Sequence, residues 1–135
     1  MPTTEEFAYI AGFIDGEGAI GIHAQKKKYG VVRSIRVVVT NSDPIPLKMI
    51  QDLYGGSLHS RSIRDNWKIS WTLFLSAHKA YNLLKDIRPY LKIKDKQAVL
   101  CLLFQEKRTR SRKKEDRVWD AVLTEAMTSL NRKGR

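Results

Sequence analysis

Residues 10–18, with the sequence IAGFIDGEG, constrain the fold of this chain more than any other segment. Phe7, Ile10 and Ile14 repeat at helical spacing, and the helix that they predict ends at Gly18, after two carboxylates set between glycines. A helix C-terminus carries partial negative charge, so acidic side chains there are mildly unfavourable. We therefore expect a positive charge nearby, and a divalent metal ion is one way of supplying it.

A second face of the same helix carries only small residues. Ala8, Gly12 and Gly16 follow one another at four-residue intervals. Glycine inside a helix costs about 1 kcal/mol relative to alanine, so Gly12 needs a structural reason. The reason that we favour is the close approach of another backbone to this face.

The chain of 135 residues is most simply one domain, residues 1–135, and it is strongly basic. It holds 25 Lys and Arg against 14 Asp and Glu, a formal net charge of +11. This excess indicates a polyanionic partner, either nucleic acid or an acidic membrane surface. No apolar run approaches the ~20 residues of a membrane span. The N-terminus is unlike a targeting peptide and the single cysteine, Cys101, cannot form an internal disulfide, so an intracellular protein is the default expectation.

Two pairs of segments alternate between apolar and polar residues, as half-buried strands do. The expected strands are residues 19–26 with 31–40, and 58–63 with 67–75, while the expected helices are 3–17, 45–53, 76–87 and 94–107. A basic linker over 107–114 and an amphipathic helix over about 115–131 follow. The order is α-β-β-α-β-β-α with extra C-terminal helices. This is an α+β fold whose four-stranded antiparallel sheet packs one apolar face on helices and turns a polar, basic face outward.

Capping signals support these boundaries. Thr3 and Glu6 have the spacing of a capping box, Asp43 precedes a proline at the start of the second helix, and Ser76 precedes the third. We expect the tryptophans on the apolar faces to be in the core: Trp67, Trp71 and Trp119.

Residues 10–18 resemble the motif that gives the LAGLIDADG homing endonucleases their name. The identical positions are Ala11, Gly12, Ile14, Asp15 and Gly18. The element order is also that of this family's fold unit, with its saddle-like sheet, and residues 88–97 look like the segment that carries its basic active-site residue. The resemblance covers about residues 5–107, and the final helix is not diagnostic.

The motif occurs once, and in single-motif members its helix packs against the same helix of a second subunit. The resemblance therefore implies a homodimer, which would suit a pseudo-palindromic target in double-stranded DNA. The residues implied at the dimer interface are Ala8, Gly12, Asp15 and Gly16.

The resemblance also implies the catalytic residues. Glu17 would be the metal-binding carboxylate and the Gly16 carbonyl a second ligand, because hard cations take such oxygens. The implied cofactor is Mg²⁺, with Mn²⁺ as a substitute and Ca²⁺ binding without supporting cleavage. Lys94 is expected to act as a base or to stabilise charge in the transition state. Asn41 would position water, although an asparagine before Ser-Asp-Pro is more often a turn residue, and Asp15 is expected to brace the helix end.

The outward face of the sheet is the expected DNA surface, since a two-stranded ribbon fits the major groove. The basic run 107–114 is expected either to contact phosphates or to remain a solvated linker. The candidate DNA-binding residues share this outward face: His23, Gln25, Lys27, Ser34, Arg36, His59, Arg61, Lys68 and Ser70.

These expectations describe a site-specific, Mg²⁺-dependent homing endonuclease that hydrolyses both strands of a long DNA target and serves the mobility of its own intron. Two alternatives use the same scaffold: an RNA maturase acting on intron RNA, and a DNA-binding protein that has lost cleavage. A generic basic protein of membrane or RNA surfaces would explain the charge but not residues 10–18. Organellar, archaeal, bacterial and phage origins stay open.

Overall fold

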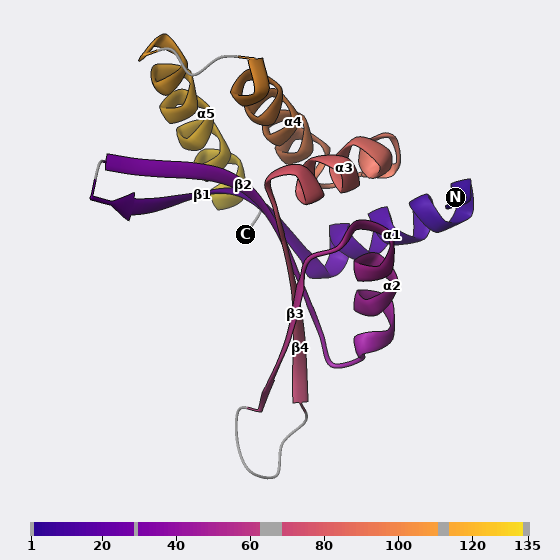
Figure 1. The fold of residues 1–135 in the computed structure, drawn as a ribbon. Coiled ribbons are helices and arrows are strands. Elements are labelled where there is room, and N and C mark those ends of the chain that lie inside the picture. Colours follow the sequence, from indigo (N-terminus) through magenta and orange to yellow (C-terminus); the bar gives the residue numbers. More distant parts are fainter. Residues whose placement is uncertain (1, 29, 63–68, 111–113, 134–135) are drawn as a thin grey trace.

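A computed structural model describes residues 2–28, 30–62, 69–110 and 114–133, and it has the predicted α+β order (Figure 1). Five α-helices, one 3-10 turn and four strands occur in these residues. They are α1 (Thr4–Glu17), β1 (Gly18–Lys27), β2 (Gly30–Asn41), α2 (Pro44–Tyr54), β3 (Ser57–Ser62), β4 (Ile69–Ser76), α3 (Ala77–Ile87), η1 (Arg88–Tyr90), α4 (Asp95–Arg110) and α5 (Lys114–Lys133).

The four strands form one antiparallel sheet in the order β1-β2-β4-β3. Pairing of Ile20 with Val37 and of Val39 with Leu73 brings the apolar side chains onto one face. Figure 1 shows the helices gathered on that side, while the β1–β2 and β3–β4 hairpins spread away from each other. The core lies between these layers, and its members from the helices include Ile10, Ile14, Leu83, Leu84 and Phe104.

Both ends of α1 are formed by local signals that the sequence contains. The Thr3 hydroxyl accepts a hydrogen bond from the Glu6 amide at 3.2 Å, and the Glu6 carboxylate accepts one from the Thr3 amide at 3.3 Å. At the other end the Gly18 amide donates to the Ile14 carbonyl. A Cβ at Gly18 would lie 3.0 Å from that carbonyl oxygen, so the turn into β1 needs a glycine.

The entry into α2 is also as predicted, with the Asp43 carboxylate accepting the Ile45 amide at 2.9 Å. Gly56 follows the helix with a φ of 109°, and a Cβ there would lie 2.7 Å from the Phe74 carbonyl oxygen. Ser76 precedes α3, but its side chain makes no capping hydrogen bond in the described structure. The chain turns there through Ala77, whose φ is 52°.

The C-terminal elements differ from the prediction. Helix α4 continues to Arg110, so residues 107–110 are helical, and residues 111–113 of the expected linker lie outside the described residues. Lysine and arginine are good helix formers, which explains why a basic run does not end a helix. Helix α5 packs beside β1, where the Asn131 amide donates to the Ile20 carbonyl at 3.2 Å.

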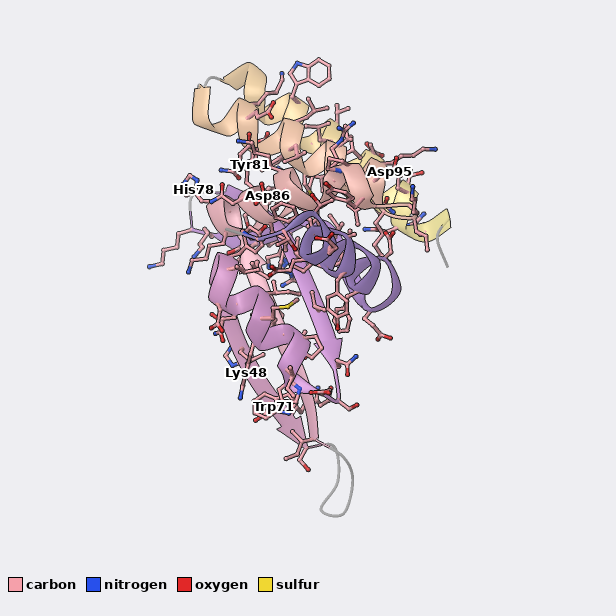
Figure 2. All side chains as sticks on the ribbon, turned by 90° about the vertical axis from the view of Figure 1, so that its right-hand side faces the viewer. Lys48, Trp71, His78, Tyr81, Asp86 and Asp95 are labelled. Carbon is pink, nitrogen blue, oxygen red and sulfur yellow. The ribbon has the colours of Figure 1, made fainter. Side chains whose placement is uncertain are left out.

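The tryptophans are not all in the core. Trp119 on α5 is 51% exposed, and the Lys107 Nζ lies 4.4 Å from its ring centroid, so the expectation of burial was wrong. α5 turns Leu123 and Met127 inward instead. Trp71 is half-buried and lies beside Lys48 of α2 (Figure 2), while Trp67 falls outside the described residues.

Among the residues described, no helix has the length and apolar character needed to cross a membrane.

Candidate active site and outer sheet face

Asp15 fastens the C-terminal end of α1 to the segment that joins η1 to α4. Its side chain is 8% exposed. One carboxylate oxygen accepts the amides of Lys92 and Ile93 at 2.7 and 3.2 Å, and the other accepts the amide of Lys94 at 3.0 Å. Asp15 is thus the brace that the sequence predicted, and its partners lie 77 to 79 residues further along the chain.

The side chain of Lys94 returns to the same helix end. Its Nζ donates to the main-chain carbonyl of Asp15 at 2.5 Å. Helix α1 has no basic residue in its last turn, so Lys94 supplies the positive charge that this helix end favours. The charge expected there is therefore provided by the chain itself. Lys92 and Lys96, its alternating neighbours, are exposed.

Glu17 is the last residue of α1, and its side chain is exposed. It has no hydrogen-bond or ion-pair partner in the described parts of the chain. Gly16 is exposed as well, and its carbonyl lies in the last helical turn, where intrahelical donors are missing. Within the described residues no three His, Cys, Asp or Glu side chains come together as a metal site. One chain thus offers a carboxylate and a carbonyl at this point, but not a complete set of ligands.

The small residues Ala8, Gly12 and Gly16 form an exposed stripe along α1. No heavy atom of the described chain lies within 4 Å of a Cβ placed at Gly12 or at Gly16. The close neighbour expected at Gly12 is therefore not found among the described residues of this chain. Asp15 does not belong to this stripe, because its side chain is buried against residues 92–94, and its place at a dimer interface stays a prediction.

Asn41 ends β2 on the helix-covered side of the sheet, in register with Trp71. Its side-chain oxygen accepts the Asp43 amide at 2.9 Å, just ahead of α2. This is the turn role that the sequence left open. A role in positioning water stays a prediction.

The strand register collects the candidate DNA-binding residues on the other face of the sheet. His23 pairs with Ser34, and Arg61 pairs with Ser70. In Figure 1 this outer sheet face, between the two spreading hairpins, has no helix over it. Lys68 lies outside the described residues. The outer sheet face includes the remaining eight candidates: His23, Gln25, Lys27, Ser34, Arg36, His59, Arg61 and Ser70.

Sequence reasoning missed one residue of the outer sheet face, Phe74. It pairs with Val38 and with Ser57. The Arg36 guanidinium carbon lies 5.9 Å from the centroid of the Phe74 ring, and the His59 ring meets it edge-on at 5.8 Å. The alternation of the expected strand 67–75, continued from Ser70 by four residues, was the signal that could have found it.

The chain thus combines an α+β scaffold, a polar and basic outer sheet face, and an exposed glutamate two residues from the carbonyl that binds Lys94. Residues 10–98 match the LAGLIDADG endonuclease family, and this match covers more than half of the chain. The chain belongs to this family.

Known proteins are similar over most of the chain. The DNA endonuclease I-CreI of Chlamydomonas reinhardtii is 24% identical over 114 residues, which are 84% of this chain and 70% of that protein. The homing endonuclease I-CvuI, crystallised with the I-CreI target in the presence of Mg, has a TM-score of 0.79 at 22% identity over 93% of this chain and 82% of its own. The archaeal intron-encoded I-Vdi141I, complexed with DNA, has a TM-score of 0.78 at 16% identity over 93% and 84%. At such identities the two structures show a shared fold.

Proposed function

We propose that this endonuclease works as a homodimer and uses a divalent metal ion to cut both strands of a specific DNA site. The observation that carries the proposal is the end of α1, where Glu17 is exposed and has no partner among the described residues, while Lys94 is held at the carbonyl of Asp15. The relatives support it, since I-CreI is named a DNA endonuclease and I-CvuI was crystallised with its target DNA in the presence of Ca.

The residues at this helix end fit a hard divalent cation. The Glu17 carboxylate and the Gly16 carbonyl are the oxygen ligands that Mg²⁺ prefers, and Mg²⁺ keeps further positions for water and substrate phosphate. Because one chain lacks a complete set of ligands, the remaining ligands would come from the DNA and from a second copy. When bound, such an ion supplies an activated water and stabilises the leaving oxygen. We expect Mn²⁺ to substitute and Ca²⁺ to bind without supporting cleavage.

The stripe of Ala8, Gly12 and Gly16 supports the homodimer. Its open surface lets two copies of α1 approach closely, as small residues on helix surfaces do. A twofold axis beside this stripe would place the two Glu17 carboxylates close to each other. Each copy would then complete the metal site of the other, and the symmetric dimer would face both strands of one duplex.

The outer sheet face would bind the duplex, with each hairpin acting as a ribbon in the major groove. Arg36 and Arg61 have the fork geometry that reads guanine, and Gln25 has an amide that reads adenine. The net charge of +11 would attract the phosphate backbone, so affinity should fall with salt by a slope of about 0.9 per neutralised phosphate.

In this arrangement the chain's own residues hold charge at fixed positions. Lys94 keeps a positive charge at Nζ beside the helix end, where a phosphate brought to Glu17 would accumulate negative charge in the transition state. The Lys94 Nζ is held as a donor to the Asp15 carbonyl, and a donor fixed in this place suits charge stabilisation.

The test is Glu17→Gln, with Glu5→Gln as the matched control because Glu5 is an exposed acid on the same helix. We expect Glu17→Gln to bind target DNA in Ca²⁺ as the wild type does and to lose cleavage in Mg²⁺, while Glu5→Gln keeps both. The target would first be selected from a random duplex library. Full cleavage by Glu17→Gln would refute the assignment of the metal-binding carboxylate. The maturase alternative gains no support from the described residues or from the relatives.

A further inference from the structure

We propose that Asp15 is a positioning residue for Lys94, and that its carboxylate sets the place of the Lys94 ammonium relative to Glu17. The contact itself is independent of what the enzyme cuts. Its consequence for cleavage rests on the function proposed above.

Lys94 is bound to Asp15 at two points, its main-chain amide and the tip of its side chain. The Asp15 carboxylate takes the Lys94 main-chain amide at 3.0 Å, and the Asp15 main-chain carbonyl takes the Lys94 Nζ at 2.5 Å. Fixing a lysine side chain costs up to about 2 kcal/mol of rotamer entropy, so a lysine held at one end only would sample many positions. The two contacts together leave Lys94 one place, directly beside the last turn of α1.

The chemistry of the carboxylate is specific to this task. Three consecutive amides, those of residues 92–94, point at its two oxygens. Asparagine has only one acceptor atom there and would present its own N–H groups to at least one of these amides. Asp15→Asn must therefore displace part of the segment that carries Lys94. Glutamate keeps both acceptors but moves them by one methylene.

The distance between Asp15 and Glu17 is two residues along one helix, so the position of Lys94 is tied to that of the proposed metal ligand. A misplacement of about 1 Å in a catalytic group can cost about 100-fold in rate. We therefore expect Asp15→Asn to reduce the single-turnover cleavage rate about 100-fold while leaving the affinity for target DNA in Ca²⁺ unchanged. Asp15→Glu should lose less, because it keeps both acceptor oxygens.

A readout that needs no DNA cleavage is the reaction of lysines in the folded protein with acetic anhydride. Mass spectrometry of peptides from the labelled protein then shows which lysines have reacted. Lys92 and Lys96 are exposed and serve as internal controls. In the wild type Lys94 should react more slowly than both, and in Asp15→Asn it should react as they do. Asp43→Asn is the matched variant, because it makes the same change at the start of α2, where asparagine caps as well as aspartate.

The outcomes separate the two proposals. Loss of Lys94 protection together with a slower rate at unchanged affinity supports the positioning role. Lys94 protection that survives in Asp15→Asn, or a wild-type cleavage rate in that variant, overturns it. A wild type that never cuts, with Lys94 protection still dependent on Asp15, supports the contact and refutes the proposed function. Should Asp15→Asn fail to fold by circular dichroism, Asp15→Glu decides by the same two readouts.

Discussion

At the C-terminal end of α1 the functional groups are tied to main-chain atoms, whereas on the outer sheet face most of them extend into solvent. Asp15 makes four hydrogen bonds with residues 92–94, two of them with Lys94, and its side chain is buried. His23, Gln25 and Arg61 are exposed, and their places follow from strand register alone. A preorganised group serves a chemical step, and a free side chain on a rigid strand can be exchanged without changing the fold.

The largest effect in this comparison should come from removing the charge of Lys94 at the C-terminal end of α1, the braced end of that helix. We expect Lys94→Gln to slow single-turnover cleavage by about 10² to 10³, the cost of losing one preorganised charge-stabilising donor. Affinity for DNA in Ca²⁺ should change little, because one charge of many is removed. Lys96→Gln, an exposed lysine in the first turn of α4, is the control for net charge. Equal slowing in both variants would contradict the special place of Lys94.

The next effect should come from the outer sheet face and should have the opposite signature. Arg36→Ala is expected to weaken binding by about 1–3 kcal/mol and to relax specificity at one base pair. The cleavage rate at saturating protein should stay the same. Phe74→Leu sharpens the comparison, because it keeps the apolar volume and removes the ring that faces the Arg36 guanidinium at 5.9 Å.

For Phe74→Leu we expect a smaller loss of affinity, about 0.5–1 kcal/mol, the size of an exposed cation–π contact. Both affinities would be measured by fluorescence anisotropy in Ca²⁺, and the rates by rapid quench in Mg²⁺. A change in rate with unchanged affinity in either variant would show that the two regions are not separate in function.

A third prediction concerns the stripe of Ala8, Gly12 and Gly16, where the α1 helices of two copies would meet. Gly12→Ala should stabilise the isolated chain by up to about 1 kcal/mol, because alanine is the better helix former and its Cβ meets none of the described residues within 4 Å. The same Cβ should weaken the dimer, since it stands where a second α1 would pack. Urea unfolding of the dilute protein and analytical ultracentrifugation measure the two effects, with Glu5→Ala as a control elsewhere on α1. A dimer that tolerates Gly12→Ala unchanged would place the interface elsewhere.

Sequence periodicity predicted the sheet well, because β1, β2 and β4 each bury residues on one face only and a period of two then fixes which residues face outward. The candidates chosen on the expected strand 67–75 ended at Ser70, and Phe74 was therefore missed. The contacts at the C-terminal end of α1 could be predicted from the sequence only in part. Residues 10–18 marked Asp15 as a brace, but its partners are far along the chain, and only packing of η1 against α1 brings them together. Trp119 and the end of α4 were mispredicted because neither apolar character nor a basic run fixes burial or helix termination.

The last effect, on stability alone, should come from the packed side of the sheet, where α4 meets β1 through Cys101. Its thiol is buried and lies 3.7 Å from the Gly21 carbonyl, and burial raises its pKa from 9.0 to about 12. A group whose pKa is raised by folding contributes stability that is complete below pH 9 and is lost as the pH rises toward 12.

The stability difference between wild type and Cys101→Ala should therefore be constant from pH 7 to 8.5. It should shift against the wild type by about 1 kcal/mol from pH 9 to 10, a little less than the 1.4 kcal/mol per pH unit that one full proton gives. Urea unfolding of both proteins with a reductant present measures this difference, and because every other titrating group is shared, it cancels. A stability difference that does not vary with pH would mean that water reaches the thiol. Helix α4 would then be packed on β1 less tightly than the C-terminal end of α1 is packed on residues 92–94.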